Sequence, residues 1–333
     1  MNRFHRQLLL AAFTPEGQAR LMQARVALVG LGALGSVQAE LLVRAGVKHL
    51  ILVDRDVVEE TNLQRQHLYT EEDLGWPKAE RAAHHLRTIW HAVEPEVYPT
   101  DLSPDNIHTI LRDAELILDG TDNWATRWLI NDFAVQKGIP WIYGGAVGAE
   151  GLVMAIQPGK SACLSCTFPP PSGQTLDACD RVGVWNTLTT LVGTLQVQLA
   201  LELLLGHEVP ASLFRITVHP FQVRRFQVHR RKDCPVCVHR RFQALEGAYT
   251  ERTLVLCGRD TVQIRPPQNR QLDLDALARR LQAMGRVERR GTVLRLIAPE
   301  GELTLFSDGR ALIRCPDCTQ GRARSLYVRW VGG

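Results

Sequence analysis

Apolar and polar positions alternate along the first 150 residues in a way that predicts a parallel β-sheet with connecting helices. Short apolar runs, typical of buried strands, take turns with longer segments whose apolar residues recur at helical spacing. The predicted strands cover residues 26–29, 49–53, 96–99, 115–118 and 141–143. The predicted helices cover residues 34–45, 78–90, 104–112 and 125–137. Apolar strands joined by helices of this length form a parallel sheet with right-handed crossovers.

The pattern changes after Gly151 and predicts antiparallel strands beside that sheet. A strand is predicted at 152–157, and the residues from 158 to 181 are rich in Pro, Gly, Ser and Cys. The long apolar segment 184–205 contains asparagine, threonine and glutamine, so it is typical of a buried helix rather than a membrane span. Two β-like runs follow it, at 213–218 and 221–228.

A second, smaller domain is predicted from residue 247 to the end of the chain. Its predicted strands cover residues 253–256, 262–264, 293–297, 303–306 and 311–314, and its predicted helices cover residues 272–284 and 322–329. The predicted fold class is therefore α/β. Residues 1–246 form a Rossmann-like domain with a mainly parallel sheet and added antiparallel strands, and residues 247–333 form a small α+β domain.

Composition and charge argue against only a few classes of function. The formal net charge of +4 is slight, and the basic run at 224–241 is typical of a solvated face, so no nucleic-acid partner is expected. The first residues lack the apolar core of a signal peptide, which predicts a cytoplasmic protein with no membrane association. In that reducing compartment, eight cysteines with several at CxxC spacing indicate metal or thiol chemistry rather than disulfides.

The segment Gly30-Leu-Gly32-Ala33-Leu-Gly35 lies between a predicted strand and a predicted helix, which is the setting of a phosphate-binding loop. Gly30 would allow the tight turn, Gly32 the close approach of backbone to phosphate, and Gly35 the packing of helix on strand. Asp54 follows about 20 residues later, where an acid can accept hydrogen bonds from ribose hydroxyls. The loop and Asp54 predict a nucleotide site and fit NAD and ATP equally well.

Further polar residues favour ATP. Asn62 and Arg65 follow the second strand, Lys78 begins a helix, and Asp122 and Asn123 follow the strand at 115–118. Nucleotidyl transfer needs cations against the developing phosphate charge and a carboxylate for Mg²⁺, whereas hydride transfer needs neither. Surface charges are the alternative, but open α/β sheets bind ligands where these residues lie, beyond the strand ends.

Two cysteine pairs, Cys163 with Cys166 and Cys234 with Cys237, predict a structural Zn²⁺ site. Four thiolates close a tetrahedral zinc site and clamp segments that are far apart in the sequence. Each pair could instead be a redox dithiol, although neither lies in a thioredoxin-like βαβ opening.

The other cysteines allow several interpretations. Cys179 lies in a polar stretch and precedes Arg181 closely, so it is either a small packed residue or a reactive thiolate. Cys257, in an apolar run, is predicted to belong to the core. Cys315 and Cys318 form a third pair. The preferred interpretation is an accidental reduced pair, followed by a partial metal site and then a redox site.

Together these residues resemble the ThiF/MoeB/HesA family, the bacterial relatives of ubiquitin-activating enzymes. The resemblance covers residues 3–243 and rests on seven features in order: Arg3-Phe-His-Arg6-Gln7, the glycine loop, Asp54, Asn62-Leu-Gln-Arg65-Gln66, Pro77-Lys78, Thr121-Asp122-Asn123 and the two cysteine pairs. It implies an enzyme that uses ATP to adenylylate the C-terminal glycine carboxylate of a ubiquitin-like sulfur-carrier protein ending in Gly-Gly. The carrier could serve thiamin, molybdopterin or tRNA-thiolation pathways.

The resemblance also implies roles for individual residues. Asp54 would hold the ATP ribose, Asp122 would coordinate Mg²⁺, and the phosphates would lie against Asn62, Arg65 and Lys78. Two further roles involve other proteins. Arg6 would reach the triphosphate of a neighbouring subunit in a homodimer. Cys179 would take part in acyl or persulfide transfer with a cysteine desulfurase or another sulfur donor.

The sequence departs from MoeB-like members in two places. The segment after Gly183 lacks their Gly-Pro pair, and the chain continues about 85 residues past the second cysteine pair, which leaves the role of the extension open. Three other functions remain as alternatives: an NAD(P)-dependent oxidoreductase, a non-catalytic zinc-stabilised nucleotide-binding module and a tRNA-modifying dehydratase of similar fold. The terminal Gly332-Gly333 resembles a carrier tail, although terminal glycine pairs are often disordered ends.

Overall fold

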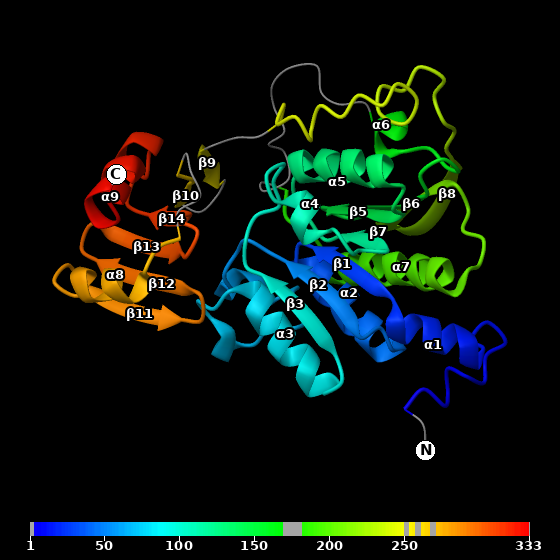
Figure 1. Ribbon diagram of the computed structural model, residues 1–333, viewed down its shortest axis with the longest axis horizontal. Helices are drawn as coiled ribbons and strands as arrows, with labels where there is room; N and C mark the ends of the chain where they lie inside the picture. The colour runs from blue at the N-terminus through cyan, green and yellow to red at the C-terminus, as the bar shows by residue number, and fades with distance from the viewer. Residues whose placement is uncertain (1–2, 169–181, 250–252, 257–260, 267–270, 333) are drawn as a thin grey trace. The chain divides into compact units, whose positions relative to one another are not determined.

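A computed structural model describes residues 3–168, 182–249, 253–256, 261–266 and 271–332. The chain forms two compact units. The larger unit contains most residues up to Tyr249, and the smaller unit contains most residues from Thr250 onward. Figure 1 shows both units with their helices and strands labelled.

The larger unit is built on an eight-stranded sheet in the order β3-β2-β1-β4-β5-β6-β7-β8. The first five strands in this order are parallel, and β6, β7 and β8 are added antiparallel to the β5 edge. The strands are β1 (Arg25–Val29), β2 (His49–Val53), β3 (Glu94–Tyr98), β4 (Leu116–Asp119), β5 (Trp141–Val147), β6 (Glu150–Ile156), β7 (Ser212–Val218) and β8 (Phe221–Gln227). The predicted α/β class with a mainly parallel sheet is confirmed.

Helices cover both faces of the parallel part of this sheet, as Figure 1 shows. The helices of the larger unit are α1 (Pro15–Gln23), α2 (Ala33–Ala45), α3 (Lys78–Ile89), α4 (Ile107–Ile110), α5 (Trp124–Lys137), α6 (Leu164–Thr167) and α7 (Asn186–Leu205). Alternate residues of β1 face opposite layers: Val26 and Leu28 pack in the cluster that contains α2 and α7, and Ala27 and Val29 pack with α5. The central strands β1, β2 and β4 are therefore buried on both sides, as parallel strands usually are, whereas the edge strand β3 is only partly buried.

The helix α7 is long and apolar enough to cross a membrane by length and composition alone. In this structure it packs on α2 and on strands β5 and β6, and Leu188, Val192 and Ala200 lie in the core of the larger unit. The helix α7 is therefore apolar because it packs inside the protein, as the sequence predicts.

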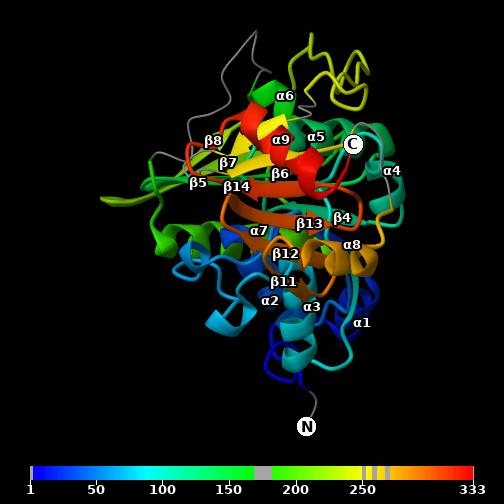
Figure 2. The same cartoon turned by 90° about the vertical axis from the view of Figure 1, so that its left-hand side faces the viewer.

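The smaller unit contains a six-stranded sheet in the order β11-β12-β13-β14-β10-β9, whose strand pairs are antiparallel. The helices α8 and α9 cross one face of this sheet, as Figure 2 shows. Its elements are β9 (Thr253–Leu256), β10 (Thr261–Ile264), α8 (Leu274–Leu281), β11 (Arg286–Arg290), β12 (Val293–Ala298), β13 (Gly301–Phe306), β14 (Ala311–Arg314) and α9 (Gln320–Trp330). Trp330, which is fully buried, anchors α9 on a core of leucine and isoleucine side chains.

Candidate nucleotide and metal sites

The glycine loop joins β1 to α2 and is confirmed as a turn that depends on its glycines. Gly30 has φ 87°, which favours glycine, and its N–H donates to the Val53 carbonyl at 2.8 Å. A Cβ on Gly35 would lie 1.9 Å from the Gly30 carbonyl oxygen, so only glycine allows α2 to begin there. A Cβ on Gly32 would meet just one neighbour, Gln66 Nε2 at 3.7 Å, so the space beside Gly32 is open.

The N-terminus of α2 opens onto this space. Gly32 is the N-cap residue, no side chain caps the helix, and no acidic residue lies in the first turn, which starts at Ala33. The first N–H groups of a helix and its dipole attract anions, and a glycine-rich turn lets a phosphate approach them closely. The loop therefore has the geometry of a phosphate site.

Asp54, at the end of β2, is tied to this loop. Its carboxylate accepts the N–H of Leu31 at 2.6 Å and the N–H of Asp56 at 2.7 Å. Burial raises the pKa of the Asp54 carboxyl, and the charge of Lys78 opposes this rise. Each carboxylate oxygen retains a second lone pair, so Asp54 orders the loop and can also accept a hydrogen bond from a ribose hydroxyl.

Lys78 begins α3 and is a buried cation, with 4% of its side chain exposed. Its Nζ lies 3.5 Å from Asp56 Oδ2, and its backbone N–H donates to the Asp56 carbonyl at 2.9 Å. The Tyr69 hydroxyl lies within hydrogen-bond distance of the carbonyl oxygens of Leu31 and Lys78, so the loop and α3 are held together. A lysine in this setting is a fixed positive charge rather than a solvated surface group.

The segment from Asn62 to Gln66 borders the same space. Asn62 is completely buried and its Oδ1 accepts the Glu59 N–H at 3.1 Å, whereas its Nδ2 donor has no hydrogen-bond partner among the described residues. A buried donor without an acceptor is costly, so Asn62 Nδ2 remains available to donate a hydrogen bond to a ligand. Arg65 is half-buried, and its Nη1 donates to the Thr61 carbonyl at 2.8 Å.

Asp122 and Asn123 lie after β4, at the same edge of the sheet. Asn123 caps α5 by accepting the Thr126 N–H at 2.9 Å. The Asp122 side chain is 75% exposed, and its Oδ1 lies 4.0 Å from Arg55 Nη2. An exposed carboxylate beside a phosphate loop has the hard oxygen atoms that Mg²⁺ prefers.

Several residues at this edge were not identified from the sequence. Arg55 lies between Asp122 and Asp101, with its Nη1 3.4 Å from Asp101 Oδ2. At the end of β4, the buried carboxylate of Asp119 pairs with Arg127, with Nε and Oδ2 3.0 Å apart. Although burial alone lowers the pKa of Arg127, the Asp119 carboxylate raises it above its ordinary value. The available signal was position, because charged residues directly after buried strands gather at one edge of a parallel sheet.

For two of the predicted site residues, Arg6 and Cys179, the described part of the structure shows no contact with the residues at this edge of the sheet. Arg6 is exposed and makes no hydrogen bond or ion pair with another described residue. Cys179 lies outside the described residues, as does Cys257. The predicted roles of Arg6 and Cys179 therefore remain predictions.

The four cysteines of the two CxxC pairs converge. The Sγ atoms of Cys163, Cys166, Cys234 and Cys237 all lie within 4.8 Å of one another. The separations are 3.8 Å for Cys163–Cys166, 3.6 Å for Cys163–Cys234 and 3.5 Å for Cys166–Cys237. Tetrahedral Zn²⁺ with Zn–S bonds of about 2.3 Å places its sulfurs about 3.8 Å apart, so this cluster fits such an ion.

The close approach of the four sulfur atoms shifts the thiol pKa values in opposite directions. A hydrogen bond from Cys163, which is itself buried, lowers the pKa of Cys166 to about 4. Burial and the neighbouring sulfurs raise the pKa of Cys237 to about 11, and hydrogen bonding to Cys166 and burial raise the pKa of Cys163. Four thiolates this close together would repel one another, so a divalent ion would be required to hold all four in the deprotonated form.

The third cysteine pair is a correction to the sequence analysis. The preferred interpretation was a reduced pair, but Cys315 and Cys318 are joined in a disulfide. The turn between β14 and α9 brings their Cα atoms to 4.9 Å, inside the range that a disulfide requires.

Comparisons with known proteins agree with this geometry. The sequence model of the ThiF family matches residues 4–236. The chain is 39% identical over 337 residues to the sulfur carrier protein ThiS adenylyltransferase of Bacillus subtilis, with 99% of each chain covered. It is 38% identical over 245 residues to the sulfur carrier protein adenylyltransferase of Thermus thermophilus, covering 71% of this chain and 90% of that one.

Among solved structures, E. coli MccB with AMPCPP and MccA has a TM-score of 0.65 at 21% identity. The match covers 71% of this chain and 74% of MccB, and MccB with ATP gives a TM-score of 0.64. These likenesses show the shared fold, and the family match covers the greater part of the sequence. The chain therefore belongs to the ThiF family.

Proposed function

We propose that this protein uses ATP to adenylylate the C-terminal glycine carboxylate of a ubiquitin-like sulfur-carrier protein. The observation that carries the proposal is the buried, unpaired Asn62 Nδ2 donor near the open glycine loop and the buried Lys78 cation. A phosphate group would satisfy the donor and the positive charges together. The relatives named as sulfur carrier protein adenylyltransferases support the same activity.

In this reaction a carboxylate oxygen of the carrier attacks the α-phosphorus of ATP. The bond from that phosphorus to the bridging oxygen breaks, and pyrophosphate leaves with the electron pair, which produces an acyl-adenylate. The N-terminus of α2, Asn62, Arg65 and Lys78 would hold the phosphates in line for attack and stabilise their charge. Asp54 would orient the ribose.

Asp122 would hold Mg²⁺, which supplies additional positive charge against the phosphates when it is bound. Its exposed carboxylate, at the end of β4, is oriented through Arg55 and Asn123. The proposed zinc ion in the four-cysteine cluster has a structural role, because four thiolates leave no open coordination position for a substrate.

The carrier is proposed to be similar to ThiS. The match to the Bacillus subtilis ThiS adenylyltransferase extends through the smaller unit and covers 99% of this chain, whereas the Thermus relative covers 71%. Cys179 and a cysteine desulfurase or another sulfur donor would convert the adenylate to a thiocarboxylate. We place this chemistry in the cytoplasm, with residues 1–246 as the adenylylating domain and residues 247–333 as a separate domain.

Pyrophosphate–ATP exchange tests the proposal. Exchange should require a carrier that ends in Gly-Gly, and it should fall by about 100-fold in Asp122→Ala, because the metal-binding carboxylate is lost. Asp113→Ala is a matched control, since Asp113 is an exposed carboxylate that pairs with Arg112 on the surface. Exchange that survives in Asp122→Ala, or tight NADH binding without ATP binding, would contradict the proposal.

A further inference from the structure

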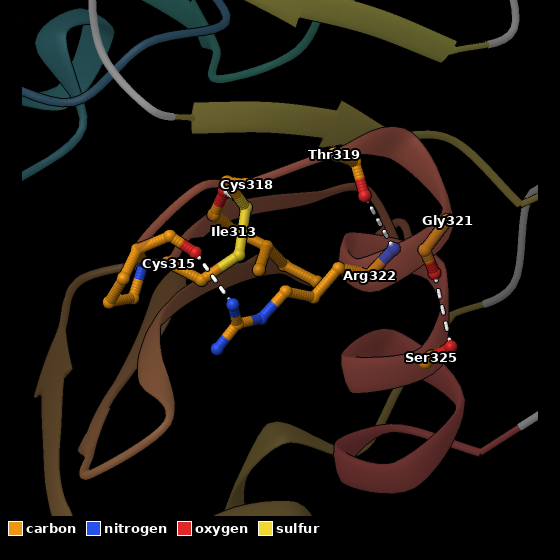
Figure 3. Close-up of a disulfide and its surroundings, with 8 residues drawn as sticks. Ile313, Cys315, Cys318, Thr319, Gly321, Arg322 and Ser325 are labelled. Carbon is orange, nitrogen blue, oxygen red and sulfur yellow. Dashed lines mark hydrogen bonds between the residues drawn. A yellow bond between two sulfur atoms is a disulfide. The ribbon is translucent and has the colours of Figure 1, made fainter.

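The Cys315–Cys318 disulfide lies at a strand-to-helix junction of the smaller unit. Cys315 directly follows β14, and Cys318 directly precedes Thr319, the N-cap residue of α9. The turn between them contains Pro316 and Asp317, and Figure 3 shows the disulfide beside the first turn of the helix. The pair belongs to the smaller unit, whereas the nucleotide loop and the four-cysteine cluster belong to the larger unit, and neither proposed role uses the pair.

The two sulfur atoms of this disulfide differ in exposure. Cys315 is 3% exposed and belongs to the core of the smaller unit, whereas Cys318 is half-buried at its surface. The Cys318 Sγ also lies 3.6 Å from the Ile313 carbonyl oxygen, which can accept the S–H of the reduced thiol. A thiol from solution can therefore reach Cys318 far more easily than Cys315, and the buried Cys315 sulfur would be the leaving group.

The disulfide contributes little as a structural crosslink. It closes a loop with only two intervening residues, and short loops restrict the unfolded chain least. The same turn has other restraints: Thr319 accepts the Arg322 N–H at 3.2 Å, and Arg322 Nη1 donates to the Pro316 carbonyl at 2.8 Å. Buried Trp330 holds the far end of α9. The bond can therefore open without loss of the surrounding fold.

The charges around Cys318 favour its thiolate form after the bond opens. Cys318 precedes the N-terminus of an 11-residue helix that has no acidic residue in its first turn. The helix dipole and the Arg322 guanidinium stabilise negative charge there, and the carboxylate of Asp317, the residue before Cys318, opposes them. A half-exposed thiolate with a buried resolving partner is the arrangement of an exchanging dithiol.

We infer that Cys315 and Cys318 form a redox-active site that exchanges with a protein dithiol of the thioredoxin class. A thiolate of the dithiol attacks Cys318 Sγ, the Sγ–Sγ bond breaks, and Cys315 leaves as a thiolate. The second thiol of the partner then attacks the mixed disulfide and releases Cys318. Two electrons pass to this protein, which gains two thiols with protons from solvent, and the partner becomes a disulfide. The inference does not depend on the adenylylation activity.

Peptide-resolved redox measurement on the full-length chain tests this site. Cleavage after Arg314 and Arg322 releases both cysteines in one peptide, 315–322, which separates them from the four-cysteine cluster. Native protein is treated with reduced thioredoxin, alkylated, digested and analysed by mass spectrometry. We expect complete reduction without denaturant and complete reoxidation by oxidised dithiothreitol. A pair that is reduced only after unfolding, or that never forms the disulfide, would overturn the inference.

Single variants test the assigned order of the two sulfurs. In Cys315→Ser, iodoacetamide should modify Cys318 at least about 10-fold faster than it modifies Cys315 in Cys318→Ser, because Cys318 is partly exposed beside a helix N-terminus whereas Cys315 is buried. Equal rates or the reverse order would contradict the assignment of Cys318 as the attacked sulfur. Thermal unfolding of both variants should resemble wild type, and loss of the folded smaller unit in both would show a structural crosslink instead.

Discussion

Gly32 and Gly35 lie in the same loop, but the space around a side chain at each position is different. A Cβ on Gly35 would lie 1.9 Å from the Gly30 carbonyl oxygen, whereas a Cβ on Gly32 would meet only Gln66 Nε2 at 3.7 Å. Gly35→Ala should therefore lower the melting temperature by several degrees, since a clash costs about 1–3 kcal/mol. Gly32→Ala should fold normally and weaken ATP binding by roughly 10-fold, because the methyl group occupies phosphate space.

Calorimetric unfolding and ATP titration of the two variants separate these effects. Each variant is the control for the other, because both add one methyl group to the same loop. A Gly32→Ala protein that binds ATP as wild type does would contradict the placement of the phosphates beside Gly32.

At the scale of single residues, the sequence predicted the loop, Asp54 and Lys78 because each has a fixed position relative to a strand or helix end. It did not predict that Arg55 would lie between Asp101 and Asp122, or that Asp56 would pair with Lys78. The Arg55 contacts join residues that follow three different strands, and the Asp56–Lys78 pair spans the long connection from β2 to α3, so these contacts depend on the way that the sheet twists and the loops close over it. The second role of Asp54, as acceptor for the Leu31 N–H, has the same origin.

At the scale of elements, Asp132 links α5 to the segment that follows the second cysteine pair. Its Oδ2 accepts the Ala244 N–H at 2.9 Å, and burial raises its pKa from 3.8 to about 7. The folded protein therefore retains this proton to a higher pH than the unfolded chain, so stability falls as pH rises from about 4 through about 7 and levels off only above the folded pKa.

Denaturant unfolding of wild type and Asp132→Asn at pH 6 and pH 8 checks this effect. From pH 6 to pH 8, wild type should lose about 1 kcal/mol more than the variant, because asparagine cannot ionise and its amide oxygen can still accept the Ala244 N–H. Equal losses in the two proteins would rule out Asp132 as the titrating group.

The four-cysteine cluster joins the segment around α6, after β6, to the segment after β8. These segments contain little regular structure, and their cysteines Cys163 and Cys234 pack in the core beside α5. Removal of zinc with a chelator should therefore unfold this region of the larger unit rather than only slow the reaction. The metal site does not exist in the unfolded chain, so the free energy of zinc binding stabilises the folded state.

Metal analysis and circular dichroism measure the two parts of this prediction. Freshly purified protein should contain about one zinc per chain, and added Zn²⁺ should restore the lost signal. Less than half a zinc per chain, or chelation without any change in fold, would contradict a structural zinc site.

The elements that the sequence predicted well are those with strong apolar periodicity and clear end signals. The helix α2 ends at Gly46 and α5 at Gly138, both with positive φ. The predictions for β1 to β4 agree within two residues at each end, whereas β5 continues to Val147, four residues past its predicted end. The charged strand β11 and the polar helix α1 were missed, because their stability comes from pairing and packing. The predicted helices at 104–112 and 272–284 are shorter, at Ile107–Ile110 and Leu274–Leu281.

At the scale of the whole molecule, the remaining prediction is a homodimer with shared sites. Phe4 packs edge-on against Trp90, with the two ring centroids 5.5 Å apart, and Gln7 Nε2 donates to the Ala45 carbonyl at 2.9 Å. The N-terminal segment is therefore anchored on both sides of Arg6. Arg6 lies exposed between these anchors, and in the predicted homodimer its guanidinium would reach the triphosphate of a neighbouring subunit. Arg6→Ala and Asp122→Ala should then each be inactive alone, because every site in either homodimer lacks one residue.

When the two variants are mixed and allowed to exchange subunits, half of the dimers contain one of each chain, and each of those has one complete site. Pyrophosphate–ATP exchange should therefore recover to about a quarter of the wild-type rate. Mixing Arg6→Ala with the double variant Arg6→Ala/Asp122→Ala is the control, and it should recover nothing because no complete site can form. If Arg6 acts within its own chain, the Arg6→Ala and Asp122→Ala mixture will also stay inactive, and the shared-site dimer is then wrong.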